Sequence, residues 1–395
     1  MEKKFEKVAA NEKNPKWNKM IQRNTSLSKK SGDIRTEFER DYTRILYSTA
    51  YRRLKHKTQI YFSPVSDHIC TRIEHVNYVE SISYTIANTL GLNTELTKAI
   101  SIAHDLGHGP FGHSGEKILN RILQEQTGES FWHEKNGLNA VDNLILLENH
   151  DGRKANLNLT YAVRDGIISH CGEVNDKILF PREEAIDLEN YNKPNEYMPY
   201  TWEGCVVKLA DRISYIGRDL EDSISVNILS KEQVEKLNSI IKFGKNMNNS
   251  NIISTLISDL CDNSTPETGL KFSEDKIKLL DELNDFCIKN IYTNPKLESA
   301  NRYFNLVLEE IFMTLYNSYD NEKTLEKLIE KNKIYPKLID GFMDWIIYYI
   351  KDGKENNKEL YDITNKKEYA KAIIHYISGM TDKYAVDIYN EIISF

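Results

Sequence analysis

The stretch IAHDLGHGPFGHSGE, residues 102–116, decides how the rest of the chain is interpreted. It holds three histidines, an aspartate, a glutamate, four glycines and a proline. Glycine lets the backbone turn sharply and approach a ligand closely, and Pro110 ends a helix because it lacks the backbone N–H. The stretch therefore predicts a helix that ends at a turn rich in titratable groups, with a second helix beginning after the turn.

Amphipathic patterns predict helices on both sides of this turn. Residues 38–54 place arginines opposite an apolar stripe, which consists of Phe38, Tyr42, Ile45, Leu46 and Thr49. Further helices are predicted over 75–92, with Gly91 as C-cap, over 95–108, with Thr94 as N-cap, and within 113–126, 159–172 and 205–224. Strand signals are few, although 58–62 alternates weakly and is a candidate hairpin arm. These patterns predict a mostly helical protein.

Composition places the chain among ordinary globular proteins. It has 395 residues, of which 40% are hydrophobic and 28% are charged. The net charge of −7 argues against a protein that coats nucleic acid, although a local basic cleft is compatible with it. No apolar run reaches the roughly 18 residues of a membrane span, so none is predicted.

Two further features predict a cytoplasmic protein. Residues 1–20 are charged and lack the apolar stretch of a secretion signal. The five cysteines are scattered, odd in number and without a CxxC pair. They are therefore predicted to be reduced thiols.

Shifts in composition predict three segments. Residues 1–32 are polar and lysine-rich and are predicted to form a loosely docked N-terminal arm. Residues 33–230 are predicted to form the core, and residues 231–395 a C-terminal helical region packed on it. Within that region, 243–270 is rich in asparagine and serine and is predicted to be a loop-broken boundary.

His104 and Asp105 are adjacent, and an imidazole beside a carboxylate suits a divalent ion. Such donors favour Mn²⁺, Fe²⁺ or Zn²⁺ over Ca²⁺. Two further ligands must come from elsewhere, and His75 and Asp211 are candidates, each in a predicted helix. The helix around Asp211 has a strongly apolar face, so an inward carboxylate there needs a partner for its charge. These four residues predict a metal site with positions left for water or phosphate oxygens.

A second group of titratable residues follows the first. His108 comes four residues after His104, which would place it on the same face of the predicted helix, one turn further on. His113 and Glu116 are three residues apart at the start of the next helix, so their side chains are predicted to hydrogen-bond. A carboxylate beside a histidine raises the pKa of the imidazole. The pair is therefore predicted to supply a general acid near neutral pH.

Each of these features also has a structural interpretation. A single His-Asp dipeptide arises by chance, a lone histidine such as His75 is commonly a core or surface residue, and the glycines alone would fit a tight interhelical turn. The joint pattern, with separate ligands on apolar helices and more titratable groups at the turn, is harder to obtain from packing alone. It favours a metal site.

Seven stretches carry a resemblance to a known family. They are RDYTRILYSTAYRRLKHKTQI (40–60), DHICTRIEHVNYV (67–79), AHDLGHGPFGHSGE (103–116), FWHEKNGLNAV (131–141), LNLTYAVRDGIISH (157–170), KLADRISYIGRDLED (208–222) and YISGMTDKYA (376–385). The chain resembles the HD-domain deoxynucleoside triphosphate triphosphohydrolases, the dGTPase-like enzymes. Residues 231–370 match the family only as helical sequence.

The resemblance implies an all-α fold, an HD-domain helical core with a C-terminal helical extension. It also implies an activity. Such an enzyme hydrolyses a deoxynucleoside triphosphate (dNTP) to deoxynucleoside and inorganic triphosphate, and so controls dNTP levels.

Site residues follow from the resemblance by motif position. The metal, expected to be Mn²⁺ or Mg²⁺ with Fe²⁺ or Zn²⁺ as alternatives, would be held by His75, His104, Asp105 and Asp211. The catalytic residues would be His113, Glu116 and His108, with His108 and His133 near the phosphates. Substrate would be bound by Arg72 and Arg212 at phosphate oxygens, by Tyr215 and Asp219 at the sugar 3′-hydroxyl, and by Gln59 nearby.

One departure from the family is visible. Many bacterial relatives have GHPPFGH where this chain has GHGPFGH, with Gly109 in place of proline. This loosens the turn but removes no ligand.

Structural interpretations also stand beside the implied roles: surface charges for Arg72 and Arg212, a core position for Tyr215, a solvated acidic run for Asp219 and an exposed turn for His133. The remaining histidines, His56, His68, His150, His170 and His375, are interpreted as structural or surface residues.

The resemblance also bears on partners. Relatives form oligomers, so a homo-oligomer, a tetramer or a hexamer, is expected, and a regulatory dNTP and single-stranded DNA are further candidate partners.

Two alternative functions remain open. The first is another HD-type nucleotide phosphohydrolase, since such enzymes share the histidine and aspartate ligands. The second is non-enzymatic, a nucleotide sensor or single-strand nucleic-acid binder without turnover, and the intact pair His113 and Glu116 counts against it. Base preference is not fixed by the sequence.

Overall fold

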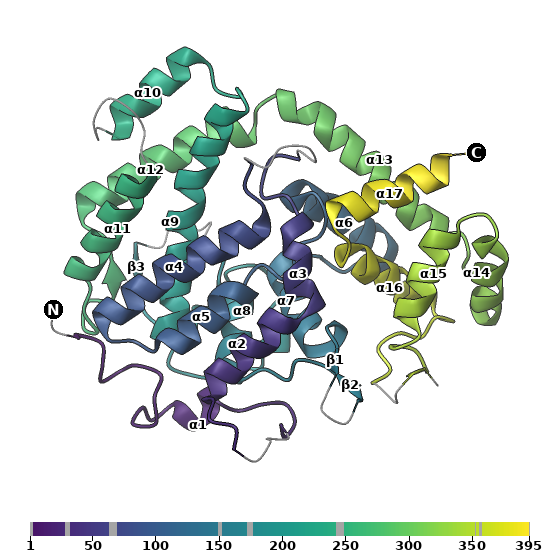
Figure 1. Ribbon diagram of the computed structural model, residues 1–395, viewed down its shortest axis with the longest axis horizontal. Coiled ribbons are helices and arrows are strands. Elements are labelled where there is room, and N and C mark those ends of the chain that lie inside the picture. Colours follow the sequence, from purple (N-terminus) through teal and green to yellow (C-terminus); the bar gives the residue numbers. More distant parts are fainter. Residues whose placement is uncertain are drawn as a thin grey trace. The chain divides into compact units, whose positions relative to one another are not determined.

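The computed structural model describes residues 3–27, 32–62, 69–148, 152–171, 177–241, 249–351, 353–354 and 358–394. Helices make up nearly all the regular structure of these residues, and the strands among them are short (Figure 1). The prediction of an all-α fold is confirmed. The described residues form two compact units, each assembled from segments far apart in the sequence.

The first unit takes its residues from Met1–Tyr47, Ser66–Asp105 and Asn158–Glu298. Its helices are α1 (Trp17–Met20), α2 (Glu37–Tyr47), α4 (Arg72–Leu90), α5 (Thr94–Ala103), α8 (Tyr161–Ser169), α9 (Trp202–Ser225), α10 (Lys231–Ile241), α11 (Asn249–Asn263) and α12 (Glu274–Cys287), with short turns η3 (Leu188–Asn190) and η4 (Ile288–Tyr292). Strand β3 (Ile178–Leu179) pairs antiparallel with β4 (Leu270–Lys271), so that Ile178 lies opposite Lys271.

Helix α4 contacts α5, α9 and α11. Its side chains Val76 and Ile86 are fully buried on the face that meets these neighbours. A capping box formed by Thr71 and Glu74 begins the helix, and Gly91, with a φ of 86°, ends it as predicted. Helix α5 in turn packs against α2, α8 and α9. The start of α4, the end of α5 and the middle of α9 position the candidate metal ligands.

The second unit takes its residues from Ser48–Val65, Leu106–Leu157 and Ser299–Phe395. Its helices are α3 (Thr49–Arg53), α6 (Gly112–Thr127), α7 (His133–Asn139), most of α13 (Lys296–Tyr316), α14 (Thr324–Asn332), α15 (Pro336–Ile346), α16 (Lys366–Ser378) and α17 (Asp382–Ile393), with turns η1 (Leu54–His56), η2 (Ala140–Leu144) and η5 (Asn321–Lys323). Strand β1 (Leu147–Glu148) pairs antiparallel with β2 (Lys154–Ala155), so that Leu147 lies opposite Ala155.

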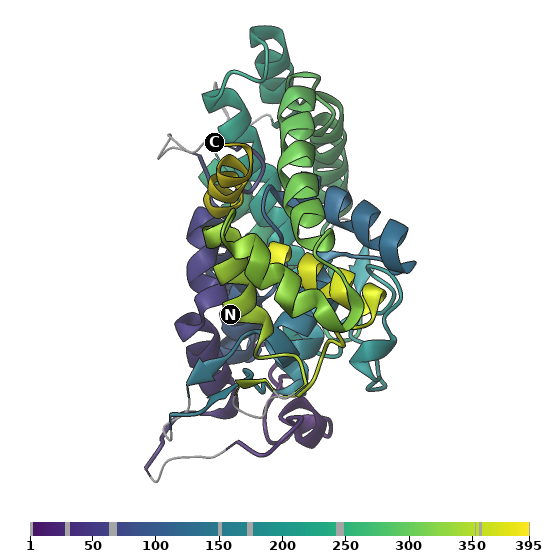
Figure 2. The ribbon, with the colours of Figure 1, turned by 90° about the vertical axis from the view of Figure 1, so that its right-hand side faces the viewer.

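One apolar cluster joins α6 to the C-terminal helices of the second unit. Leu119 of α6, Ile311 of α13, Phe342 of α15 and Ile373 of α16 are all fully buried in it. Helix α15 packs against α14, α16 and α17, and these four helices lie together in Figures 1 and 2. The C-terminal residues therefore share a core with the helix that follows the GHGPFG turn. The segment boundaries at residues 32 and 230 stay predictions.

Residues 3–27 are held more firmly than their polar composition predicts. Phe5 and Ala10 are fully buried. The backbone N–H of Phe5 donates to the carbonyl oxygen of Leu90 at 2.8 Å, and that of Ala10 donates to Oε1 of Glu203 at 2.9 Å. The prediction of a loosely docked arm is therefore wrong for these residues, because a few apolar side chains and buried hydrogen bonds outweigh many exposed lysines.

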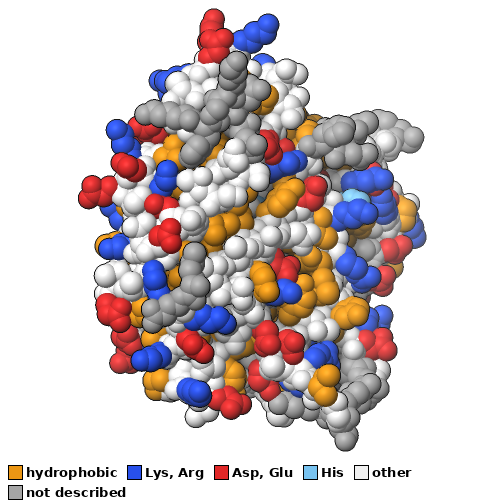
Figure 3. Space-filling model, turned by 60° about the vertical axis from the view of Figure 1, so that its left-hand side comes forward, with side chains coloured by type: hydrophobic (Ala, Val, Ile, Leu, Met, Phe, Trp, Pro, Cys, Tyr) orange, Lys and Arg blue, Asp and Glu red, His pale blue; other side chains and the backbone are white. Residues whose placement is uncertain are grey.

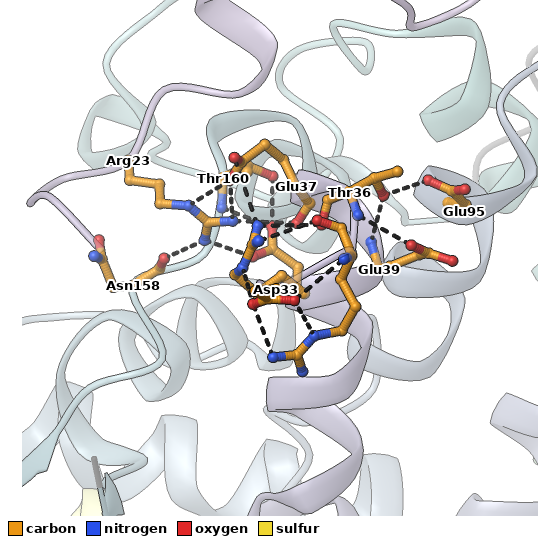
Figure 4. Close-up of polar contacts among 11 residues, drawn as sticks. Arg23, Asp33, Thr36, Glu37, Glu39, Glu95, Asn158 and Thr160 are labelled. Carbon is orange, nitrogen blue, oxygen red and sulfur yellow. Dashed lines mark hydrogen bonds and ion pairs between the residues drawn. The ribbon is translucent and has the colours of Figure 1, made fainter. Parts of the chain in front are cut away.

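Arg23 fixes the N-terminal segment to two other parts of the first unit (Figure 4). Its guanidinium lies 3.0 Å from a carboxylate oxygen of Glu37 and 2.5 Å from one of Asp41, and it donates to the carbonyl oxygen of Asn158 at 2.6 Å. Asp41 is buried and also accepts hydrogen bonds from the backbone and hydroxyl of Thr160. Burial raises the pKa of the Asp41 carboxyl although Arg23 opposes it. This network fixes the start of α2 to the chain before α8.

The helix predicted over 38–54 is interrupted. Helix α2 ends at Tyr47, and Ser48 takes an extended backbone and caps α3, its Oγ accepting the N–H of Tyr51 at 3.1 Å. Leu46, predicted on the buried stripe, is exposed. Local capping chemistry therefore overrides the longer apolar pattern at this point.

Two predictions about irregular segments are also wrong. Among the described residues, 58–62 form no strand of a hairpin. Helix α11 occupies much of the predicted loop-broken boundary at 243–270, of which 243–248 lie outside the described residues. Ile252, Leu256 and Leu260 recur at helical spacing and are fully buried in α11. This apolar face outweighs the weak helix propensity of the asparagines and serines around it.

The surface drawn in Figure 3 carries charges of both signs. Basic and acidic side chains are intermixed with apolar ones over most of that face. Such mixing is unlike the basic stripe that follows a nucleic-acid backbone. Single-stranded DNA stays a predicted partner. Within the described ranges, every helix is too short or too polar to cross a lipid bilayer.

Replacing His375 by asparagine is expected to remove a pH dependence of stability. His375 on α16 is half-buried, and its Nδ1 lies 2.6 Å from Oη of Tyr361. Burial lowers the pKa of His375 from 6.5 to about 4. Between those values the unfolded chain binds more protons than the folded one, so the free energy of unfolding rises with pH, by on the order of 3 kcal/mol in total.

Urea titrations near pH 4.5 and pH 7 measure this effect. The oxygen of asparagine can accept the hydrogen bond of Tyr361, so the His375→Asn protein should fold and show a smaller rise between the two pH values. An equal rise in both proteins would show that other groups cause it.

Candidate metal centre and histidine cluster

Both ends of helix α5 differ from the prediction. Asn93, not Thr94, is the N-cap, and its side chain accepts the first backbone N–H groups of the helix. The helix ends at Ala103, with His104 as its C-cap. His108 is therefore not on the same helical face as His104, and that prediction is wrong. The glycines that follow favour turns over a further helical turn.

Four side chains of the first unit converge where α4, α5 and α9 pack together. They are the predicted metal ligands His75, His104, Asp105 and Asp211, named here the HD cluster. Nε2 of His75 lies 3.0 Å from Oδ1 of Asp211 and 3.8 Å from Oδ2 of Asp105. Nε2 of His104 lies 3.6 Å from Oδ1 of Asp105 and 3.8 Å from Oδ1 of Asp211. The fold thus brings together candidate ligands from three separate segments.

These distances fit donors around one ion. Donors bound at about 2.1 Å in octahedral geometry lie about 3 Å apart when adjacent and about 4.2 Å apart when opposite. Nδ1 of His104 lies 2.6 Å from the carbonyl oxygen of Ser101, a contact that places the proton on Nδ1 and the lone pair on Nε2. That Nε2 is buried and hydrogen-bonds to no described residue. A buried lone pair facing two carboxylates fits a divalent cation.

The charges of the HD cluster depend on one another. Burial is the largest influence and opposes ionisation of both His75 and Asp211. Their hydrogen bond and the neighbouring charges outweigh it, so the pKa of His75 is raised and the pKa of Asp211 is lowered. Nη1 of Arg72 lies 2.6 Å from Oδ2 of Asp105, and Arg72 is fully buried. Arg72 therefore adds positive charge beside the ligands and is not a surface residue.

His170, interpreted from sequence as a structural or surface residue, lies against the HD cluster. Its buried ring meets that of His104 edge-on, with the ring centroids 4.8 Å apart. Gly166 makes this approach possible, since a Cβ there would lie 2.6 Å from Cγ2 of Ile100 on α5. His104, Asp105 and His170 offer donor atoms within 4.8 Å of one another. A signal was present, because His170 ends one of the stretches that match the family.

The predicted substrate-binding residues of α9 differ in their surroundings. Arg212 is buried, and its Nη2 lies 3.3 Å from Oδ1 of Asp281 on α12. Tyr215 is half-buried. Asp219 is buried rather than solvated, and it accepts a hydrogen bond from Oη of Tyr292 at 2.7 Å. Tyr292 comes from the part of the chain that matched the family only as helical sequence, so no motif pointed to it.

Four titratable side chains gather in the second unit, His108, His113, Glu116 and His133, named here the histidine cluster. Glu116 is their shared partner. Its Oε2 lies 2.9 Å from Nδ1 of His133, 3.7 Å from Nδ1 of His113 and 4.0 Å from Nε2 of His108. The rings of His108 and His133 stack with their centroids 3.8 Å apart. The structure brings His113 and Glu116 together as predicted, with His133 as a closer third member.

The imidazoles keep Glu116 ionised. Burial is the largest influence on its pKa and raises it, but the charge of His133 and the hydrogen bonds from His113 and His133 hold that pKa well below the ordinary range. His108 and His133 are buried, whereas the side chain of His113 is 49% exposed. His133 is therefore not an exposed turn residue. His113 is the histidine of this cluster that solvent reaches most easily.

Gln59 follows η1 in the second unit. Its Oε1 is buried and accepts no hydrogen bond from a described residue. Nearby, the buried ammonium group of Lys57 donates to the carbonyl oxygens of His108 and Ser378. Lys57 therefore ties the chain beside Gln59 to the turn that carries His108.

The turn before α6 is fixed by backbone contacts. Phe111 has a φ of 64°, which is uncommon for a residue with a side chain, and its N–H donates to Oδ1 of Asp382 at 2.9 Å. A Cβ on Gly115 would lie 1.8 Å from the carbonyl oxygen of Pro110, so only glycine fits there. These contacts hold the backbone between the histidines of the turn in one conformation.

Gly107→Ala is expected to destabilise the protein by about 3 kcal/mol. A Cβ at this position would lie 2.0 Å from the carbonyl oxygen of His133 and 2.2 Å from the backbone nitrogen of Gly137. Backbone atoms cannot move aside without shifting α7. Urea unfolding followed by circular dichroism measures the loss.

Gly109→Ala is the matched control. The nearest atom to a Cβ there is Cδ1 of Leu119 at 3.0 Å, the end of a flexible side chain, so we expect a loss below about 1 kcal/mol. Similar losses for the two variants would show that the close backbone approach at Gly107 is not the cause.

Comparison with known proteins decides the family. Residues 72–216 match the family described as HD domain. A deoxyguanosinetriphosphate triphosphohydrolase-like protein of Caldanaerobacter subterraneus is 34% identical over 363 residues, which cover 91% of this chain and 86% of that protein. The chain belongs to this dGTPase-like family. Proteins of the same description are 33% identical over 382 residues in Rickettsia felis (91% and 92% covered) and 35% identical over 290 residues in Desulfatibacillum aliphaticivorans (73% and 75% covered).

Family membership agrees with the resemblance seen in the sequence motifs. The HD match begins at Arg72, the first residue of α4, and ends within α9. It spans every residue of the HD cluster and of the histidine cluster. The dGTPase-like chain thus carries both clusters inside the region that defines the HD domain.

Proposed function

We propose that this dGTPase-like protein hydrolyses dNTPs to deoxynucleoside and inorganic triphosphate, with a divalent metal ion at the HD cluster. The observation that carries the proposal is the convergence of His75, His104, Asp105 and Asp211 at spacings that suit one ion. The name of the relatives, triphosphohydrolase-like protein, supports the substrate class. We expect Mn²⁺ or Mg²⁺ at the site, with Fe²⁺ or Zn²⁺ as alternatives.

The phosphates require positive charge. A triphosphate carries about four negative charges, which cationic groups must meet. The bound metal would stabilise charge on the α-phosphoryl oxygen. Arg72, already buried beside Asp105, would contact one phosphate oxygen. Arg212 would contact another by exchanging its ion pair with Asp281, whose side chain is 42% exposed.

The leaving group requires a proton. In the proposed reaction water attacks the α-phosphorus, the bond from phosphorus to the 5′ oxygen breaks, and the deoxynucleoside leaves. The departing alkoxide is a poor leaving group unless it is protonated. We assign its proton to His113, which solvent reaches and whose Nδ1 lies 3.7 Å from Oε2 of Glu116. His108 and His133 would hold Glu116 and contact the phosphates.

Sugar recognition is assigned to Tyr215 and Asp219. Tyr292 orients the carboxylate of Asp219 by donating to its Oδ2 at 2.7 Å. A site built to hydrogen-bond a 3′-hydroxyl rejects analogues that lack it, because its buried polar groups would then be left without partners. Gln59, with its buried Oε1, completes the proposed substrate-binding set.

Product analysis tests the proposal. The purified protein is incubated with Mn²⁺ or Mg²⁺ and each dNTP, alone and in mixtures, and the products are separated by ion-exchange chromatography. We expect deoxynucleoside and inorganic triphosphate in equal amounts. Pyrophosphate or single phosphate would identify another HD nucleotide phosphohydrolase. The absence of product in every mixture would identify a nucleotide sensor or single-strand nucleic-acid binder.

The same assay addresses regulation and assembly. Turnover in mixtures but not with single nucleotides would identify a regulatory dNTP, and added single-stranded DNA tests that partner. Sedimentation with and without dNTPs tests the expected tetramer or hexamer.

A further inference from the structure

The histidine cluster has a property that proton transfer does not require. Its four donor groups, three imidazoles and a carboxylate, offer atoms that all lie within 4.8 Å of one another. Around a tetrahedral Zn²⁺ with bonds of about 2.0–2.1 Å, donor atoms lie about 3.3–3.4 Å apart. The distances from Oε2 of Glu116 to the imidazole nitrogens, 2.9, 3.7 and 4.0 Å, bracket that spacing.

We propose that the histidine cluster is a binding site for a transition-metal ion of the Zn²⁺ type, separate from the ion at the HD cluster. All four ligands belong to the second unit, whereas the HD cluster belongs to the first. Three nitrogens and one oxygen suit Zn²⁺, whereas Mg²⁺ and Ca²⁺ prefer oxygen donors. The histidine cluster, with one more imidazole and one fewer carboxylate than the HD cluster, therefore favours Zn²⁺ more strongly than the HD cluster does.

The surroundings of the histidine cluster favour a preformed site. The backbone N–H of His133 donates to Oε1 of Glu116 at 3.4 Å, which helps to hold the carboxylate in place. Asn136 donates to the carbonyl oxygen of Gly107 at 2.7 Å and so ties α7 to the turn that carries His108. The half-exposed side chain of His113 gives an ion a path from solvent.

This inference rests on the proposed function for its consequence. A metal ion at the histidine cluster would occupy Nδ1 of His113, the ring nitrogen that faces Glu116, and this imidazole could then no longer form the doubly protonated cation that donates a proton. Bound Zn²⁺ and proton donation to the 5′ oxygen therefore exclude each other. We infer that Zn²⁺ inhibits turnover by binding at the histidine cluster.

Co²⁺ binding to the full chain, without nucleotide, tests the site. Co²⁺ takes the place of Zn²⁺ and absorbs visible light strongly when four-coordinate but weakly when six-coordinate, so the absorption separates this site from an octahedral HD cluster. We expect a strong band that saturates at one four-coordinate Co²⁺ per chain. His113→Gln and Glu116→Gln should each abolish it.

His56→Gln is the matched control, because His56 is an exposed histidine of the second unit outside the cluster. It should keep the band. Since His113 is half-exposed, its replacement leaves the core intact, and circular dichroism verifies the helical content of each variant. No strong band in the natural protein, or a band that survives in both His113→Gln and Glu116→Gln, would overturn the site.

Zn²⁺ titration then tests the consequence. Zn²⁺ should displace Co²⁺ and remove the band, and turnover should fall over the same range of free Zn²⁺. Loss of turnover at Zn²⁺ concentrations that leave the band intact would overturn inhibition at this cluster. The Co²⁺ experiment uses no nucleotide, so a band without dNTP hydrolysis would refute the proposed function and support the site, whereas hydrolysis without a band would do the opposite.

Discussion

Asp211→Asn is expected to empty the HD cluster of metal and to lower kcat by about a thousandfold or more. Oδ1 of Asp211 is the donor that approaches both imidazoles, at 3.0 Å from Nε2 of His75 and 3.8 Å from Nε2 of His104. Asparagine removes the negative charge while keeping the shape. Stabilisation by a metal ion is worth several kcal/mol, and about 4 kcal/mol corresponds to a thousandfold in rate. Metal content after dialysis and the product assay measure both effects.

Asp222→Asn is the matched control for this experiment. Asp222 is a second aspartate of α9 and is buried, but it accepts the backbone N–H of Cys70 at 3.0 Å and contacts Arg218 at 3.1 Å instead of the HD cluster. Its replacement should leave the metal bound. A metal content equal to that of the natural protein in Asp211→Asn would show that the ligand set is wrong, and loss of metal with unchanged turnover would show that the ion is not catalytic.

The end of α5 shows why His104 and Asp105 can contact the same ion. Adjacent residues within a helix point about 100° apart, which makes shared coordination difficult. Because α5 ends at Ala103, His104 and Asp105 leave the helix there, and their facing atoms come within 3.6 Å of each other. The sequence pattern predicted His104 and Asp105 as candidate ligands but placed them inside a helix that runs to residue 108. The apolar spacing continues beyond Ala103, and only the packing of the turn ends the helix.

Local patterns predicted the parts of the fold that depend on one segment alone. Helix α4 is an example, because its buried face and its Gly91 cap are both present in 75–92. The convergence of the HD cluster was predictable for a related reason, since each of its four residues lies within a recognisable motif. Contacts between distant segments were not predictable in this way. Tyr292 reaches Asp219 only because η4 folds back on α9, and no pattern around Tyr292 reports that contact.

The same distinction explains the N-terminal segment. Its lysines and asparagines make residues 3–27 polar on average, and average polarity predicted a loose arm. Phe5 and Ala10 are nevertheless fully buried, and Glu203, far along the chain, accepts the N–H of Ala10. Two buried apolar side chains and one buried hydrogen-bond acceptor hold the N-terminal segment in place. These contacts cannot be recognised from the sequence until the partner segment is known.

His113→Gln is expected to lower kcat by about a hundredfold while the HD cluster keeps its metal. Loss of general acid catalysis costs between about 10² and 10⁴ in rate. His113 supplies no ligand to the HD cluster in this assignment, and its side chain is 49% exposed, so the fold should tolerate glutamine. Since the proton is needed only as the 5′ oxygen leaves, kcat should fall and KM should change little. Initial rates over a range of dNTP concentrations measure both.

A substrate with a better leaving group separates proton donation from a structural role. The test substrate is a triphosphate ester in which a more acidic alcohol replaces the deoxynucleoside, so that the alcohol can leave as its anion. If His113 protonates the 5′ oxygen of a dNTP, His113→Gln should hydrolyse this ester nearly as fast as the natural protein does. His56→Gln, which changes an exposed histidine of the same unit, should match the natural protein on both substrates. Equal losses on both substrates would show that His113 positions the phosphates instead. Glu116, which the remaining imidazoles keep ionised, would then repel the substrate phosphates, and KM would rise.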